Sequence, residues 1–324
     1  MARTLKIPQI DEEERFLVRV AWACEIEGLT QARAAERFKV TRLRVNQALG
    51  EARRRGIVRV SINSSYGLCA EAEARLGARF GLDHACVAPN MISDDMVQAM
   101  VGYALGLHLS DVLSDTAVKR FGMSWGNTLN MATRSLKTID RPDLEIVSVM
   151  GGLTRGSDLN ILEITTRLAK MCNASLSYLT APLYAGSHES QAILVDQDVF
   201  RKVIDKIRGA DALAMAAGDM SERSMLIRDG LPSDIRRDDL VAAGAVGDVL
   251  GYFLDARGEL VDHPLNSRVI GIELEDLRAI PDVILAAGGR HKVPIIRAAL
   301  SRGLINTLVT DEETAFTLLE DEPE

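Results

Sequence analysis

The chain has 324 residues, of which 47% are hydrophobic and 26% are charged, and its formal net charge at pH 7 is -8. This length suits one large domain plus a small one, and the charged fraction is that of an ordinary globular protein. No uninterrupted apolar run approaches the roughly 18 residues that span a bilayer, and residues 1–15 lack the apolar segment of a signal peptide. We therefore expect a cytoplasmic protein with no membrane partner.

The cysteines indicate neither a metal site nor a disulfide framework. There are four, at Cys24, Cys69, Cys86 and Cys172. They are widely spaced, without a CxxC or other metal-ligand pattern. We predict reduced thiols, no metal site and no bound cofactor.

The charge is unevenly distributed along the chain. Residues 1–62 contain 13 basic and 8 acidic residues, whereas the remainder contains 25 basic and 38 acidic ones. The excess is concentrated in Thr30–Val60, with 9 basic and 2 acidic residues. Because local charge decides contact with phosphates, this segment predicts a surface for a polyanion. Charge alone, however, favours a solvated basic helix.

Three helices are predicted in the first sixty residues. Asp11–Glu27 has apolar residues at helical spacing and ends at Gly28. Thr30 is placed to cap a second helix that runs to about Phe38, and Thr41 to cap a third that runs to about Arg55. Two short helices joined by so tight a turn predict a helix-turn-helix, and the segment 57–62 predicts a strand, as in a wing.

The third helix has the residue types that read DNA. The N-terminal part of a recognition helix enters the major groove, where Arg reads guanine and Asn or Gln reads adenine, and arginines further along contact phosphates. The predicted DNA-binding residues are Thr30, Gln31, Thr41, Arg42, Leu43, Arg44, Asn46, Gln47, Arg53 and Arg54. The alternative is a plain three-helix bundle that contacts protein. We divide the chain into a DNA-binding domain, residues 1–63, and a larger domain, residues 64–324.

In the larger domain, strand-like runs alternate with helical ones. A helix is predicted at Ala70–Phe80. The predicted strands are Val118–Met123, Glu145–Met150, Ser175–Thr180, Ala212–Ala217, Val283–Ala287 and Leu304–Val309. Strands separated by helices predict a doubly wound α/β fold, with a mostly parallel sheet covered on both faces. Ligands of such sheets bind beyond the carboxyl ends of the strands.

Three glycine-containing loops and two aspartates fall where a ligand would bind. Glycine allows close backbone approach, helix N-termini favour anions, and carboxylates accept hydrogen bonds from hydroxyl groups. The predicted effector-binding residues are Gly126, Asn127, Thr128, Gly152, Leu153, Arg155, Asp219, Asp248, Gly288, Gly289 and Lys292. Each has an ordinary alternative, since glycines occur in tight turns and aspartates cap helices or form turns.

Motifs in both domains resemble one family. In the N-terminal domain they are Glu27–Gln31, Ala35–Phe38, Glu51–Arg53 and Gly56–Val58; in the larger domain they are Ser124–Leu129, Met150–Gly152, Ala181–Leu183, Gly247–Asp248 and Ala287–Lys292. Together they resemble the SorC family of sugar-binding transcriptional regulators over nearly the whole chain. The resemblance implies an effector domain similar to sugar-phosphate isomerases and deaminases, a phosphosugar-type effector and often a tetramer. It also implies phosphate contacts at Gly126–Thr128 and Lys292.

Two departures from the family pattern leave the ligands open. Thr41–Gln47 differs from the family's usual opening of the third helix, so the operator sequence cannot be transferred. Asn127 stands where members commonly have threonine, so a non-phosphorylated sugar or polyol is also allowed.

The predicted function is a DNA-binding regulator, a repressor of a carbohydrate or polyol catabolic operon. Its predicted partners are double-stranded operator DNA, a sugar, polyol or sugar-phosphate effector, and further copies of itself in a dimer or tetramer. The alternatives are a sugar-phosphate isomerase or deaminase and a protein-binding adaptor. The five histidines form no recognisable catalytic group, so we predict no enzyme.

Overall fold

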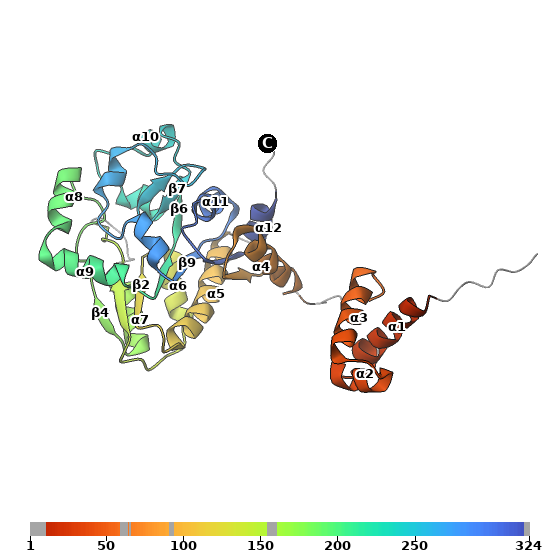
Figure 1. Ribbon diagram of the computed structural model, residues 1–324. Coiled ribbons are helices and arrows are strands. Elements are labelled where there is room, and N and C mark those ends of the chain that lie inside the picture. The colour runs from red at the N-terminus through yellow and green to blue at the C-terminus, as the bar shows by residue number, and fades with distance from the viewer. Residues whose placement is uncertain (1–10, 59–63, 65, 91–93, 154–160, 321–324) are drawn as a thin grey trace, which may run out of the picture. The chain divides into compact units, whose positions relative to one another are not determined.

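The computed structural model describes residues 11–58, 64, 66–90, 94–153 and 161–320, and Figure 1 shows the chain. The chain divides into two compact units, Met1–Ser64 and Ser65–Glu324. We call them the N-terminal unit and the C-terminal domain.

The described part of the N-terminal unit is helical. It consists of α1 (Glu12–Ala21), a π-helical turn (Trp22–Ile26), α2 (Gln31–Phe38) and α3 (Arg42–Arg54). The side chains of Thr30 and Thr41 accept hydrogen bonds from the backbone N–H groups of Arg33 (3.3 Å) and Arg44 (3.2 Å), so both predicted caps are present. A core of small and branched side chains joins the helices: Leu17, Val20, Ala21, Ala34, Ala35, Val45, Ala48, Leu49 and Ala52.

The first helix departs from its prediction near its end. The α-helix stops at Ala21, and in the π-helical turn the N–H of Glu27 donates to the carbonyl of Trp22 at 3.1 Å. The wider turn shifts the buried face, so Ala23 is buried and Cys24 only partly so. Of the predicted wing, residues 59–62 lie outside the described residues, and Ile57 packs against the helical core.

The C-terminal domain contains a seven-stranded sheet in the order β1-β10-β9-β5-β2-β3-β4, in which every neighbouring pair is parallel. The strands are β1 (His84–Ala88), β2 (Arg120–Met123), β3 (Glu145–Ser148), β4 (Ser175–Ser177), β5 (Ala212–Met215), β9 (Asp282–Ala286) and β10 (Thr307–Asp311). This confirms the predicted parallel α/β domain.

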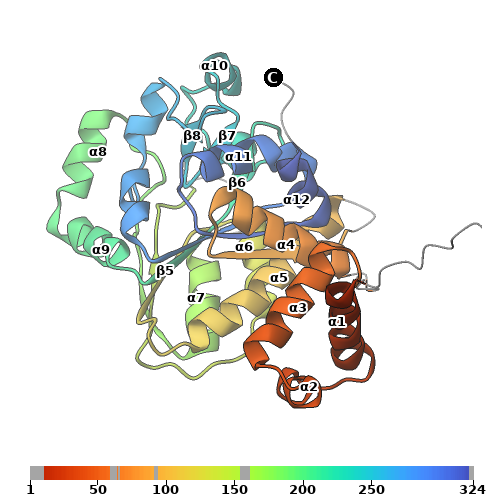
Figure 2. The same ribbon diagram turned by 45° about the vertical axis from the view of Figure 1, so that its right-hand side comes forward.

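Helices cover both faces of the sheet. On one face lie α4 (Gly67–Phe80), α9 (Asp198–Arg208), α11 (Val293–Ser301) and α12 (Glu312–Leu319); on the other lie α5 (Asp94–Ser114), α6 (Asn127–Ser135) and α7 (Ile161–Cys172). Figures 1 and 2 show α5, α6 and α7 side by side. Along β5, Leu213 and Met215 face the first layer, while Ala212 and Ala214 face the second, as strand alternation requires.

A second sheet, of three antiparallel strands, stands beyond the end of β5. It contains β6 (Ala217–Asp219), β7 (Gly247–Val249) and β8 (Tyr252–Leu254). The predicted strand Ala212–Ala217 therefore ends early, because Ala217 already pairs in the other sheet. The remaining helices are α8 (His188–Val195), α10 (Arg237–Ala242), a π-helical turn (Leu226–Gly230) and short 3-10 helices at Pro264–Arg268, Leu274–Ala279 and Arg290–Lys292.

Helix α5 has an unusual composition. Averaged over 18 residues, Met96–Ser114 is long and apolar enough to cross a membrane, although the sequence shows no uninterrupted apolar run of that length. The helix instead packs in the C-terminal domain, where Leu105 and Leu109 are fully buried. Gly106 allows close packing on α6, because a Cβ there would lie 2.7 Å from the carbonyl oxygen of Ala132.

Candidate functional site

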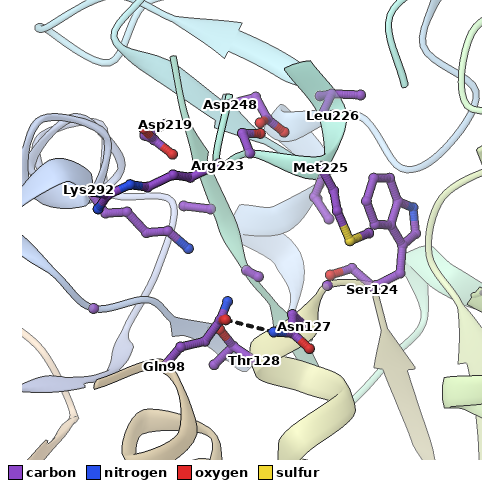
Figure 3. Close-up of a pocket in the computed structure, with 18 of the residues that line it drawn as sticks. Gln98, Ser124, Asn127, Thr128, Asp219, Arg223, Met225, Leu226, Asp248 and Lys292 are labelled. Carbon is purple, nitrogen blue, oxygen red and sulfur yellow. Dashed lines mark hydrogen bonds between the residues drawn. The ribbon is translucent and has the colours of Figure 1, made fainter. Parts of the chain in front are cut away.

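The centre of the parallel sheet positions the candidate site. The chain passes from β2 to β3 in one direction across the sheet and from β5 to β9 in the other, so the strand order reverses between β2 and β5. A crevice forms at such a reversal, beyond the carboxyl ends of the strands. A cavity of about 530 Å³ lies there, and Figure 3 shows its lining.

One wall of the cavity is the start of α6. The N-cap Gly126 has no side chain that could compete with a ligand for the first N–H groups of the helix. Thr128, in the first turn, is buried. The Asn127 amide donates to Gln98 Oε1 at 2.6 Å, which joins α6 to α5 (Figure 3). This wall presents hydrogen-bond donors.

A second wall follows β9. Gly288 fits its position because it has no side chain: a Cβ would lie 2.5 Å from Asp311 Oδ2 and 2.8 Å from Val101. The next N–H, of Gly289, donates to Asp311 and Thr314 at 2.8 Å each, which fixes the turn. The chain then enters the 3-10 helix Arg290–Lys292, and Lys292 extends into the cavity (Figure 3).

The third wall presents carboxylates from the small sheet. Asp219 ends β6 and Asp248 lies in β7, where it pairs in register with Gly218. A Cβ on Gly218 would lie 2.2 Å from Asp248 Oδ1, so only glycine allows this approach. Both aspartates are buried, and Figure 3 shows them across the cavity from Asn127.

Burial perturbs the charged groups of the cavity. It raises the pKa of Asp248 to about 7, opposed by the N–H of Gly251 (3.2 Å from Oδ2) and by the charge of Lys292, while the charge of Asp219 adds to the rise. Burial lowers the pKa of Lys292, opposed by the two carboxylates. Asp219 Oδ2 accepts from the Ser221 N–H at 3.0 Å, but its buried Oδ1 has no hydrogen-bond partner among the described residues. A ligand hydroxyl group would satisfy that oxygen.

The predicted effector residues are not all at this cavity. Seven of them line it: Gly126, Asn127, Thr128, Asp219, Asp248, Gly288 and Lys292. Gly289 lies behind the lining, held by Asp311 and Thr314. Gly152 and Leu153 line a second cavity of about 300 Å³, which also contains the buried Arg268. Arg155 lies outside the described residues.

Other residues that line the cavity were absent from the predicted set. They are Gln98, Ser124, Trp125, Met150, Ala216, Ala217, Gly218, Arg223, Ser224, Met225, Leu226, Leu250 and His291. Ser124, Trp125 and His291 belong to loops that the sequence singled out, so adjacency could have included them. No local signal marks Gln98, which comes from the middle of a hydrophobic helix.

The candidate nucleic-acid surface lies on the N-terminal unit. Arg42, Asn46 and Gln47 are exposed on α3, and Leu43 is 66% exposed, an unusual position for so apolar a side chain. Thr30 and Thr41 act as caps, and Gln31, at the start of α2, is partly buried. The side chains of these residues form no ion pair with any residue that the structure describes.

The remaining predicted DNA-binding residues form ion pairs within the unit. Arg44 pairs with Glu13 at 3.2 Å, Arg53 pairs with Glu25 at 2.9 Å, and Arg54 pairs with Glu51. Such exposed pairs contribute little to stability, ~0–1 kcal/mol each. These arginines could therefore exchange a carboxylate for a phosphate at small cost.

Comparison with known proteins identifies the family. Residues 64–320 match the family model described as "Putative sugar-binding domain". The chain is 33% identical over 310 residues to the transcriptional regulator LsrR of Escherichia coli O139:H28, with 95% of each chain covered, and 33% identical over 312 residues to LsrR of Enterobacter sp.. The chain belongs to the SorC/DeoR family of sugar-binding transcriptional regulators. This confirms the family predicted from the sequence motifs.

Solved structures of the SorC/DeoR family have the same fold. Two of them are the full-length sorbitol operon regulator SorC from Klebsiella pneumoniae and a DeoR family transcriptional regulator from Listeria monocytogenes. The SorC structure has a TM-score of 0.71 and covers 96% of this chain and 100% of its own. The Listeria structure has 26% identity and a TM-score of 0.70, and covers 77% and 99%. These relatives are transcriptional regulators, not enzymes.

Proposed function

We propose that this SorC/DeoR-family regulator represses a carbohydrate or polyol catabolic operon inside the cell. The N-terminal unit would bind operator DNA, and the 530 Å³ cavity would bind a sugar, a polyol or its phosphate. The observation that carries the effector assignment is Oδ1 of buried Asp219, which has no hydrogen-bond partner in the part of the chain that the structure describes. It lies beside buried Asp248 and opposite the start of α6, whose N-cap Gly126 makes no side-chain hydrogen bond. Carboxylate acceptors facing helix N–H donors suit a polyhydroxylated ligand.

The polarity of the cavity indicates how such a ligand would lie. Its hydroxyl groups would donate to Asp219 and Asp248. The negative charge of these carboxylates would repel an anion from that wall of the cavity. A phosphate or other electron-rich end would lie at Gly126–Thr128, where helix N–H groups and the helix dipole favour negative charge. Lys292 comes from the 3-10 helix after β9, and its charge opposes the rise in the pKa of Asp248. We assign it to the same electron-rich end.

On the DNA side, we propose that α3 is the recognition helix. Arg42, Asn46 and Gln47 would read base edges in the major groove, while Arg53 and Arg54 would contact phosphates. The support is their exposure on one helix whose opposite face, with Val45 and Ala52, is buried. Effector binding would then act by stabilising a protein state with a different operator affinity.

A thermal-shift screen of sugars, polyols and their phosphates tests the effector assignment. A binder present at 100 times its Kd stabilises the folded domain by about 2.7 kcal/mol. Asp219→Asn should weaken the shift, because one carboxylate acceptor becomes a donor-bearing amide. Asp238→Asn, at an exposed aspartate on α10, is the matched control and should leave the shift unchanged. Equal shifts for both variants would refute the assignment.

Operator binding needs a separate measurement. Fluorescence anisotropy with DNA from upstream of the chain's own operon should show salt-dependent, sequence-specific binding that the identified effector weakens. Absence of specific binding at low salt, with the effector absent, would refute the DNA-binding proposal without affecting the effector assignment.

A further inference from the structure

The second cavity of the C-terminal domain contains a buried guanidinium group. The cavity has a volume of about 300 Å³, within the range of small-molecule sites. Arg268 lines it, and its side chain is only 9% exposed. A buried charge is unfavourable unless it is paired and hydrogen-bonded. The groups around this guanidinium therefore indicate what the cavity can hold.

The backbone holds Arg268 in place. Its Nε donates to the carbonyl oxygen of Ala185 at 2.8 Å, and the N–H of Ala185 donates in return to the carbonyl oxygen of Arg268 at 2.8 Å. The N–H of Leu183, on the same wall, donates to the carbonyl oxygen of Gly152 at 2.7 Å. A ligand would therefore meet a guanidinium whose position is already fixed, which reduces the entropy lost on binding.

The outer end of the guanidinium has a single partner. Nη1 donates to Asp234 Oδ2 at 2.8 Å, and Nη2 makes no hydrogen bond with any residue that the structure describes. The Asp234 side chain is 61% exposed, and its hydrogen bond with Arg268 lowers its pKa, so it is an ionised carboxylate on the solvent side of the pair. Two N–H groups of one guanidinium match the two oxygens of one carboxylate. The single bond to Asp234 leaves half of that geometry unused.

We propose that the second cavity binds a small hydroxycarboxylate, whose carboxylate takes the place of Asp234 and spans Nη1 and Nη2 of Arg268. Asp234 would be released to water, and its existing exposure keeps the free-energy cost of that release small. The inference is independent of the proposed function, because it involves neither DNA nor the effector cavity.

The charges of the lining favour a carboxylate over a phosphate. Arg268 is the only basic residue among the described residues that line the cavity, whereas Asp229 and Asp234 are both acidic. Asp229 Oδ2 accepts from Arg228 Nε at 2.9 Å, so Asp229 is already paired as a carboxylate. A phosphate dianion would bring a second negative charge toward Asp229, whereas a carboxylate brings one.

Other groups of the lining suit the rest of such a ligand. Asp229 and Ser233 offer oxygen atoms to a hydroxyl group, and Leu231 and Pro232 offer apolar surface to its carbon atoms. These groups predict that glycerate binds more tightly than propionate, which has no hydroxyl group. Glycerol, which has no carboxylate, should bind more weakly for lack of a partner for Arg268.

The second cavity is separate from the effector cavity. Of the described residues, none lines both. The π-helical turn Leu226–Gly230 contributes to each: Leu226 lines the effector cavity, and Asp229 and Gly230 line the second. Leu153 packs against this turn, since a Cβ on Gly230 would lie 2.7 Å from Leu153 Cδ2. Substitutions can therefore distinguish a ligand of one cavity from a ligand of the other.

Isothermal titration calorimetry of the full-length chain with glycerate tests the proposal. The wild-type protein should bind glycerate with a Kd of about 1 mM or below, and phosphate, propionate and glycerol at least about tenfold more weakly. Asp234→Asn should lower the Kd for glycerate about fivefold, because an exposed ion pair no longer competes for Arg268. The controls are Asp238→Asn, at another exposed aspartate, and Asp219→Asn, in the effector cavity; both should leave this Kd unchanged.

Arg268→Lys tests the guanidinium itself. Lysine keeps the charge but cannot offer two parallel N–H groups, so the Kd for glycerate should rise at least about tenfold. Circular dichroism melting shows whether this variant folds; if it does not, Asp234→Asn decides alone, since Asp234 is exposed. The proposal is overturned if glycerate binds neither the wild type nor Asp234→Asn, if Asp234→Asn fails to tighten binding, or if phosphate binds more tightly than glycerate. Loss of glycerate binding in Asp219→Asn would place the ligand in the effector cavity and overturn the proposal as well.

Discussion

The two units of this regulator differ in how far apart in the sequence their key contacts lie. In the N-terminal unit, Thr30 and Thr41 cap helices that begin at the next residue. In the C-terminal domain, the cavity joins Asn127 and Lys292, which follow β2 and β9, with Asp219 and Asp248, which lie in β6 and β7 of the other sheet. Local contacts specify the unit proposed to bind DNA, whereas long-range contacts specify the effector cavity.

The two units also differ in where their charged side chains lie. The N-terminal unit pairs its arginines with carboxylates at an exposed surface, as Arg53 does with Glu25. The C-terminal domain buries Asp219 and Asp248 without a salt bridge to either among the described residues. Exposed pairs can exchange partners cheaply, but buried carboxylates need a specific partner. The two units are therefore suited to a polyanion and to a small polar molecule respectively.

The largest expected effect concerns pH and the C-terminal domain alone. Because burial raises the pKa of Asp248 from 3.8 to about 7, its ionised form opposes folding. Stability from this group is fully present below pH ~4 and is lost as pH rises toward 7, by up to about 4 kcal/mol for a shift of about three units. Urea unfolding of the ligand-free protein between pH 5 and 8 should show this loss. Asp248→Asn should flatten it.

The chain has one tryptophan in each unit, which makes this measurement selective. Trp22 reports on the N-terminal unit and Trp125 on the cavity. The pH-dependent loss should appear in the fluorescence of a Trp22→Phe variant and be absent from that of a Trp125→Phe variant. A pH dependence that survives Asp248→Asn would contradict the assignment, and Asp238→Asn is the control for a general effect of removing a carboxylate.

The next effect tests the close approach of two strands. Gly218→Val would bring a Cβ within 2.2 Å of Asp248 Oδ1, so either the buried Asp248 carboxylate or the small sheet must shift. We expect a loss of about 1–3 kcal/mol in the unfolding of the C-terminal domain and no detectable effector-induced thermal shift. The matched control is Gly244→Ala, because Gly244 has open space around it; its positive φ of 91° should cost stability but leave the effector shift intact. An intact shift in Gly218→Val would contradict this account.

The sequence was most informative where contacts are local or strongly periodic. It predicted the three N-terminal helices with their threonine caps, the alternation of strands and helices, and the loops that follow β2 and β9. It missed β1, whose first residues are only partly buried, and it extended β5 through Ala217 because a change of sheet leaves no local mark.

The cavity was less predictable, for a physical reason. Gly152 followed a strand as the other loops did, but it bridges to Pro182 and its carbonyl accepts from the Leu183 N–H at 2.7 Å, which places it at the second cavity. Gln98 reaches the first cavity from α5 by its bond to Asn127. Neither placement depends on neighbours in sequence, so a single sequence contains no signal for it.

An effect of similar size should appear in operator binding without a change in stability. Asn46 is exposed on α3, so Asn46→Ala removes a proposed base contact and nothing from the core. Specific operator affinity should fall by about 1–3 kcal/mol, while affinity for unrelated DNA stays the same. Arg54→Ala should instead weaken both kinds of binding and reduce the salt dependence. Equal effects of the two variants on specific and unspecific DNA would contradict the division into base and phosphate contacts.

The smallest expected effect tests whether local contacts really specify the N-terminal unit. Thr41 Oγ1 accepts from the Arg44 N–H at 3.2 Å, so Thr41→Ala leaves that N–H to water and should destabilise the unit by about 1 kcal/mol. Thr41→Ser keeps the hydroxyl and should recover most of the loss. In the Trp125→Phe background, Trp22 fluorescence should show the shift in the melting curve. With Trp125 retained, because it lines the cavity, the effector-induced thermal shift of the C-terminal domain should be the same in both variants, since no residue of the cavity lies in the N-terminal unit. A loss of effector response in Thr41→Ala would show instead that the folding of the two units is coupled, and the contrast between local and long-range specification would fail at the boundary between them.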